Sequence, residues 1–168
     1  MDDGAADDWA QDCDRKGLTV LKEKRTQQVH EVAGPHLRPD EQVQLASYAS
    51  VGAVSVKRRV ATAAATAVAS GGLLAVSVRP RRRYIAMTQD RLLFFNGDTP
   101  SGKPGRSVLM DIPRQSTTVA DVKKGFLTLT VQLAVEGQDM GLKLIFPRPT
   151  RDDGEKLAAE IPAAPQPA

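Results

Sequence analysis

The segment from residue 83 to residue 146 restricts the fold most, because short runs of strand-forming residues alternate there with turn-forming residues. Apolar and polar residues alternate in Phe126–Leu133 and in Leu142–Phe146, well enough to bury one face of a sheet. The segment 97–106 holds three glycines and two prolines and predicts a loop. The expected hairpin turns are Gln89-Asp90, Lys124-Gly125 and Gly137-Gln138. We expect antiparallel strands at residues 83–88, 91–96, 107–112, 117–123, 126–136 and 139–146.

The regions on either side of this segment predict one more strand and a helix. Residues 42–50 favour a strand, because Val43 and Leu45 alternate with glutamines. A helix is expected at 15–34, where apolar residues recur near the helical period and Gly34-Pro35 can end the helix.

A closing helix is expected at residues 150–161, with Thr150 as its N-cap and with Leu157 and Ile161 buried. The predicted fold class is therefore α+β, mainly antiparallel β. It is a seven-stranded bent sheet or partly open barrel, capped by a C-terminal helix and preceded by an extra N-terminal helix.

Residues 60–78 form a stretch of 19 uncharged residues, seven of them alanine, between two basic clusters. The length is that of a membrane-spanning helix, but alanine is far less lipophilic than leucine or valine. The favoured interpretation is a helix at 57–69, a break at Gly71-Gly72 and a strand at 73–79. The small residues of 61–69 would allow close packing on a sheet or on another copy of the chain.

The first 14 residues hold six aspartates and no lysine or arginine, whereas the whole chain has a net charge of +3. Residues 1–14 are expected to be a disordered acidic tail, and a tail of this charge could also fold back over a basic face. An acidic start is unlike a signal peptide, so we expect a cytoplasmic protein. Residues 162–168, rich in proline and alanine, are expected to be a second loose tail.

Motifs that carry enzyme chemistry are missing from the sequence. It has one cysteine and two histidines, and Pro104 after Lys103 spoils the only segment that resembles a P-loop. Asp111 and Asp121 could become paired carboxylates only by accident of folding. We therefore predict no catalytic residues, no metal site and no cofactor.

Two motifs carry a resemblance to a known superfold. Tyr84–Phe95 (YIAMTQDRLLFF) resembles a hairpin with the pattern aliphatic-x-T-x-x-R-L-aliphatic, and Leu37–Val43 (LRPDEQV) resembles the entry to a first strand. Both are similar to bacterial pleckstrin-homology-like (PH-like) and GRAM-like domains. The resemblance covers residues 37–161, and the alanine-rich insertion 57–72 departs from it. In the hairpin, structural roles are expected: Thr88 can bond the turn backbone, Asp90 tolerates left-handed backbone, and Arg91 can answer Asp90 or a carbonyl.

The region from Lys57 to Arg106 holds ten basic residues and two acidic ones. Such a cluster can be a solvated face or can contact an anionic surface. In PH domains that bind phosphoinositide headgroups, basic residues surround the connection between the first two strands. The resemblance thus implies six residues for contact with anionic lipid or a partner: Lys57, Arg58, Arg59, Arg81, Arg82 and Arg83.

The predicted function is a non-enzymatic PH-like binding module, peripheral at the cytoplasmic face of the membrane or on a protein partner. One alternative is a structural homo-oligomer that associates through the alanine-rich helix at 61–69. Nucleic-acid binding is less favoured, because only 4% of the residues are aromatic and no recognition motif is present. A small-ligand-binding barrel is the remaining alternative.

Overall fold

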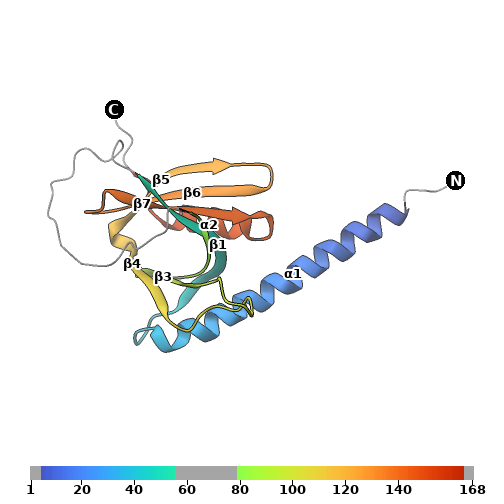
Figure 1. Cartoon of the computed structure of the whole chain (residues 1–168), viewed down its shortest axis with the longest axis horizontal. Helices are drawn as coiled ribbons and strands as arrows, with labels where there is room; N and C mark the ends of the chain where they lie inside the picture. Colours follow the sequence, from blue (N-terminus) through green and yellow to red (C-terminus); the bar gives the residue numbers. More distant parts are fainter. Residues whose placement is uncertain (1–4, 56–78, 165–168) are drawn as a thin grey trace.

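A computed structural model describes residues 5–55 and 79–164, and the side chains from Thr19 onward within those ranges except that of Ser55. The seven strands of the described part form one antiparallel sheet in the order β4-β3-β2-β1-β7-β6-β5 (Figure 1). Two α-helices and three short 3-10 helices complete the fold. The helices are α1 (Ala5–Ala33), η1 (Gly34–His36), η2 (Arg114–Ser116), η3 (Arg148–Thr150) and α2 (Arg151–Glu160). The strands are β1 (Val43–Ser55), β2 (Arg81–Thr88), β3 (Arg91–Asn96), β4 (Val108–Pro113), β5 (Thr117–Lys124), β6 (Thr128–Val135) and β7 (Met140–Pro147).

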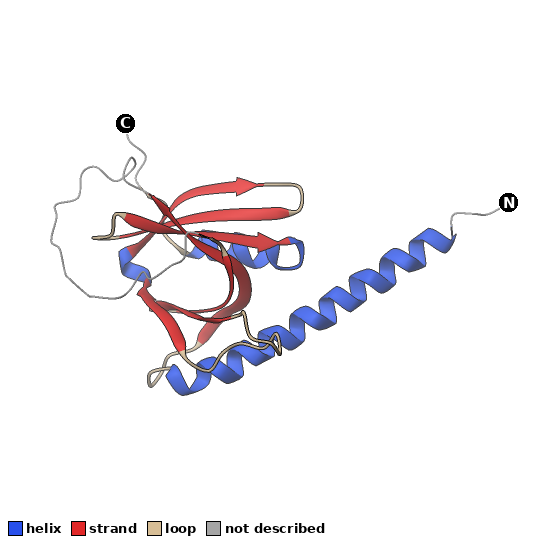
Figure 2. Ribbon diagram, in the orientation of Figure 1, coloured by secondary structure: helices blue, strands red, loops and turns tan. Residues whose placement is uncertain are grey.

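The long strand β1 joins the two halves of the sheet. Its first part pairs with β2, from Val43 opposite Thr88 to Val51 opposite Arg81. Its last part, from Ser50 to Ser55, pairs with β7. Because the two partners lie on opposite edges of β1, the sheet continues through this strand and bends (Figure 2). Strands β4 and β5 are the two outer strands of the sheet, so the barrel is not closed.

The concave face of the bent sheet encloses the main core, and α2 packs into it. Leu157 of α2 and Ile161 beyond it join the buried aliphatic residues of β5, β6 and β7. Gly154 permits the close approach of α2, because a Cβ built there would lie 2.6 Å from Cδ2 of Phe146. The buried stripe expected at Leu157 and Ile161 is confirmed.

The outer face of β1, β2 and β3 is covered by the C-terminal half of α1. Val29 and Ala33 are fully buried there against a second cluster that includes Tyr48, Tyr84 and Phe95. The Arg25 guanidinium lies 4.8 Å from the centre of the Tyr48 ring. Lys22 Nζ lies 3.0 Å from Oδ1 of Asp153 on α2. Successive residues of β1 thus face two different cores, which explains why apolar residues occur on both faces of this strand.

The predicted fold class is confirmed, and several local details differ. The N-terminal helix begins at Ala5 rather than at residue 15, so most of the expected acidic tail belongs to α1. Alanines and early acidic residues suit the first turns of a helix. Strand β1 runs to Ser55 rather than to residue 50, because pairing with β7 extends it.

Two side-chain expectations were wrong, and the strand expected at 126–136 begins later, at Thr128. Phe126 is 93% exposed, because β6 begins at Thr128 and buries the opposite parity, Leu129, Val131 and Leu133. Thr150 stands at the N-cap position of α2 but makes no capping bond; its Oγ1 donates to the carbonyl of Tyr48 instead. Positive φ among the described non-glycine residues occurs at Asp40, not at Asp90.

The helix expected at 57–69 and nearly all of the strand expected at 73–79 lie outside the described residues. The tail 162–168 is described only up to Ala164. Within the described ranges, no helix has the length and apolar character needed to cross a membrane.

Candidate functional site

Three of the six candidate binding residues, Arg81, Arg82 and Arg83, are described, and they lie at the start of β2. Arg81 and Arg82 open β2 and are both exposed. Successive residues of a strand point to opposite faces, so these two arginines project from opposite sides of β2. The arginine run therefore does not form a single flat patch. Lys57, Arg58 and Arg59 follow β1 in the sequence but lie outside the described residues.

Arg83 is bonded to its neighbours, so its charge is less available to a ligand than the charges of the exposed Arg81 and Arg82. Its Nη1 donates to Oδ1 of Asn96 at 2.8 Å and lies 3.5 Å from Oδ2 of Asp98. The side chain is only 18% exposed. Arg83 thus fixes the start of the loop between β3 and β4, as Asn96 is its cross-strand partner.

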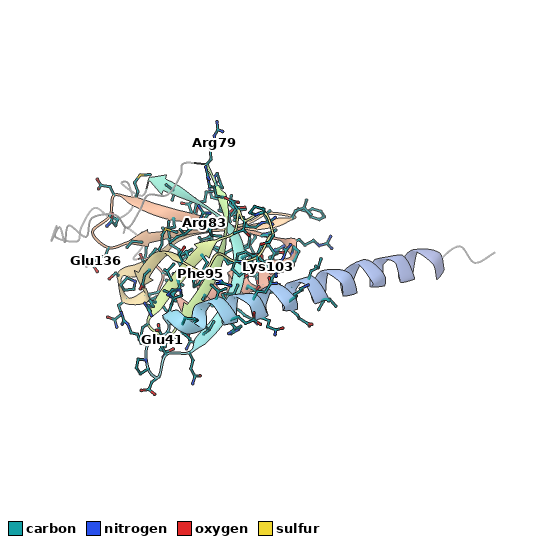
Figure 3. All side chains as sticks on the ribbon, turned by 60° about the horizontal axis from the view of Figure 1, so that its bottom comes forward. Glu41, Arg79, Arg83, Phe95, Lys103 and Glu136 are labelled. Atoms are coloured by element: carbon teal, nitrogen blue, oxygen red, sulfur yellow. The ribbon has the colours of Figure 1, made fainter. Side chains whose placement is uncertain are left out.

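The surroundings of this end carry charges of both signs. The β3–β4 loop brings the exposed residues Lys103 and Arg106, and Gly97 of this loop bonds to the carbonyl of Arg82. Asp98 of the same loop supplies the negative charge, with its Oδ2 3.5 Å from Nη1 of Arg83. Figure 3 shows Arg79 near one end of the sheet and Glu41 at the other.

A buried polar cluster lies at the end of the molecule that holds Glu41. The guanidinium of Arg91 donates from Nε to Oε1 and from Nη2 to Oε2 of Glu41, both at 2.8 Å. The same Nη2 donates to the carbonyl of His36 at 2.7 Å, and Nη1 donates to Asp111. Thr88 Oγ1 donates to Glu41 at 2.7 Å and accepts from the backbone of Arg91 at 3.1 Å.

This cluster shifts the pKa values of Glu41 and Arg91, and both groups stay hydrogen-bonded within it. Hydrogen bonds from Arg91 lower the pKa of Glu41 from 4.5 to about 2, against the opposing effect of burial. Hydrogen bonds to Glu41 raise the pKa of Arg91. Every buried side-chain nitrogen or oxygen in the described part has a hydrogen-bond partner. The cluster therefore acts as a closed structural network.

The expectation for Thr88 is confirmed, because its Oγ1 accepts from the backbone of Asp90 and of Arg91. Arg91 donates to a carbonyl, that of His36, which is one of the two kinds of partner expected, and to Glu41 and Asp111 rather than to Asp90. Asp111 pairs with Arg91, while Asp121 lies 3.7 Å from Lys123, so these two aspartates do not form a carboxylate pair. Within the described ranges, no group of three or more His, Cys, Asp or Glu residues could hold a metal ion.

The tip of the β5–β6 hairpin is a surface feature that the sequence interpretation missed. Phe126 is 93% exposed, and Leu127 is 55% exposed. Lys123 and Lys124 precede this pair, with side chains 70% and 60% exposed. The available signal was the parity of the strand: residues 127, 129, 131 and 133 are all aliphatic, which sets Phe126 on the other face.

Comparisons with known proteins do not assign the chain to a family. Neither the models of protein families nor the curated proteins contain a match to the chain.

Proposed function

We propose that the protein is a non-enzymatic PH-like binding module that attaches peripherally to an anionic membrane surface. The observation that carries the proposal is the exposure of Arg81 and Arg82 where β2 leaves the connection from β1. The three basic residues Lys57, Arg58 and Arg59 stand at the other end of that connection in the sequence. The layout of the sheet and of α2 agrees with the PH-like expectation.

The strength of such an attachment follows from the number of basic residues that reach the surface. Each lysine or arginine near an anionic bilayer contributes about 1 kcal/mol. Because Arg81 and Arg82 project from opposite sides of β2, both reach the bilayer only when the start of β2 meets it end-on; the two then contribute about 2 kcal/mol, or about a 30-fold increase in binding. Stable attachment requires further residues of the cluster, and it must weaken as salt screens the charges.

Flotation of the full chain with vesicles tests this proposal. Phosphatidylcholine vesicles with and without phosphatidylserine are compared at about 0.1 M and about 1 M salt, where the screening lengths are about 10 Å and about 3 Å. We expect flotation with the anionic vesicles at the lower salt and its loss at the higher salt. No flotation with anionic vesicles at the lower salt would contradict the proposal.

A matched pair of variants distinguishes binding through Arg81 and Arg82 from an effect of the overall net charge. The variant Arg81→Gln/Arg82→Gln is expected to reduce flotation by about tenfold or more. The control Arg148→Gln/Lys156→Gln removes the same charge from exposed positions on η3 and α2 and is expected to have little effect. Equal losses in the two variants would show that attachment depends on overall charge and not on this end of the sheet.

A second candidate function is binding to a protein partner through the β5–β6 tip, which is favoured by the exposure of Phe126. Hydrophobic side chains of this size at a hairpin tip are common contact residues in protein interfaces. A photo-crosslinking residue at position 126 in cells tests it, with position 109 on β4 as the control, since Leu109 is also exposed. Crosslinks of equal yield at both positions would contradict a specific partner at the tip.

A further inference from the structure

Helix α1 extends well beyond the part of the molecule that it covers. Its 29 residues span about 43 Å at 1.5 Å per residue. The contacts that dock it involve its C-terminal part, from Lys22 through Arg25 and Val29 to Ala33. Figures 1 and 2 show the N-terminal half running away from the sheet into open space.

The described residues at the start of this projection are apolar and exposed. Val20 is 62% exposed and Leu21 is 51% exposed. Val20 stands nine residues before Val29, which is two and a half helical turns, so it lies on the side of α1 opposite to the docked side. By the same period, positions 9, 13 and 17 share the face of Val20. Most helical stability in proteins comes from the packing of an apolar face and not from helix propensity.

The sequence of α1 also divides by charge. From Ala5 to Asp14 it holds four aspartates and no basic residue. From Arg15 to Arg25 it holds five basic residues and one acidic residue; Lys22 and Arg25 contact the body of the molecule, which leaves Arg15, Lys16 and Lys24 for a second copy. When two such helices lie antiparallel, the acidic part of each helix lies beside the basic part of the other. The two-fold axis between the copies makes these two contacts equivalent. A parallel arrangement would oppose like charges.

We propose that two copies of this chain associate through the projecting halves of their α1 helices, paired antiparallel. The occupant of the exposed face at Val20 is then the same face of the second copy. This contact is independent of the proposed membrane attachment, which uses the far end of the sheet and another part of the chain. It also differs from association through residues 61–69, because α1 alone supplies it.

Sedimentation equilibrium of the full chain measures this association. We expect a monomer–dimer equilibrium that strengthens at low salt, with a mass that rises from 18.1 kDa toward twice that value as concentration increases. The variant Val20→Asp is expected to weaken dimerisation at least tenfold while the thermal midpoint of the sheet stays unchanged. The control Leu109→Asp changes an exposed residue of β4 and is expected to leave the dimer intact.

Charge reversal tests the antiparallel arrangement. One variant, Asp8→Lys/Asp12→Lys, removes the net negative charge of residues 5–14; the other, Lys16→Glu/Lys24→Glu, removes the net positive charge of residues 15–25. Each alone is expected to be monomeric, and an equimolar mixture is expected to recover the dimer. A wild-type chain that stays monomeric at high concentration and low salt overturns the proposal. So does a dimer that survives Val20→Asp or either charge-reversed variant.

Discussion

Arg91 and Glu41 are joined side by side by two hydrogen bonds, from Nε to Oε1 and from Nη2 to Oε2, each 2.8 Å long. Fifty residues separate them in the sequence. Glu41 belongs to the motif at the entry to β1, and Arg91 belongs to the β2–β3 hairpin motif, which also supplies Thr88. The segments Leu37–Val43 and Tyr84–Phe95 therefore meet in one buried cluster, where hydrogen bonds join the chain before β1 to the hairpin.

The first prediction concerns the loss of charge at Glu41. The variant Glu41→Gln leaves the buried guanidinium of Arg91 without its main partner, so we expect a loss of about 3 kcal/mol in the free energy of unfolding. Chemical denaturation at neutral pH measures it. The control Glu136→Gln neutralises an exposed carboxylate and is expected to change stability by less than about 0.5 kcal/mol. Similar losses in both variants would contradict the structural role of Glu41.

The same pair predicts a stability that depends on pH. The pKa of Glu41 is lowered from 4.5 to about 2 in the folded state, so the unfolded chain binds a proton at this group more readily. Its contribution is fully present above about pH 5 and declines as pH falls from about 4.5 toward 2. Denaturation curves recorded at several pH values give the free energy of unfolding at each pH. Between about pH 5 and pH 2 this free energy should fall more steeply for the wild type than for Glu41→Gln. Parallel curves would show that another carboxylate causes the acid sensitivity.

The packing of α2 predicts the effect of a methyl group at position 154. In Gly154→Ala the new Cβ would lie 2.6 Å from Cδ2 of Phe146 and 2.8 Å from Cδ2 of Leu129. Alanine favours a helix by up to about 1 kcal/mol, but overpacking costs about 1–3 kcal/mol. We expect a net loss, seen as a fall of several degrees in the thermal midpoint. A rise in the midpoint would mean that α2 can shift away without cost.

Helix α1 offers a matched pair of valines that tests its docking. Val29→Ala removes two methyl groups from a fully buried side chain and is expected to cost about 2 kcal/mol. Val20→Ala removes the same groups from a side chain that is 62% exposed and is expected to change the stability of the monomer little. Thermal unfolding at low protein concentration compares the two. Equal costs would show that α1 does not dock as the structure has it.

The exposed tip of the β5–β6 hairpin predicts a substitution without a stability cost. Phe126→Ser should change the free energy of unfolding by less than about 0.5 kcal/mol, because the ring packs against little of the protein. Phe94→Ser is the control at a fully buried phenylalanine and should cost several kcal/mol, about 3–5 by comparison with other phenylalanine truncations. A large loss in Phe126→Ser would mean that the tip folds back onto the sheet in solution.

The sequence by itself determined the local parts of this protein. The strands from β2 to β7, their turns and the burial of Leu157 on α2 follow from periodicity and from glycine and proline, which act over a few residues.

The tertiary structure decided what depends on distant pairing. The bonding of Glu41 to Arg91 and the extension of β1 along β7 each follow from strand pairing, which joins residues far apart in the sequence. The physical reason is that local preference selects helix or strand, whereas the burial and neighbours of a side chain depend on which distant strands and helices pack together.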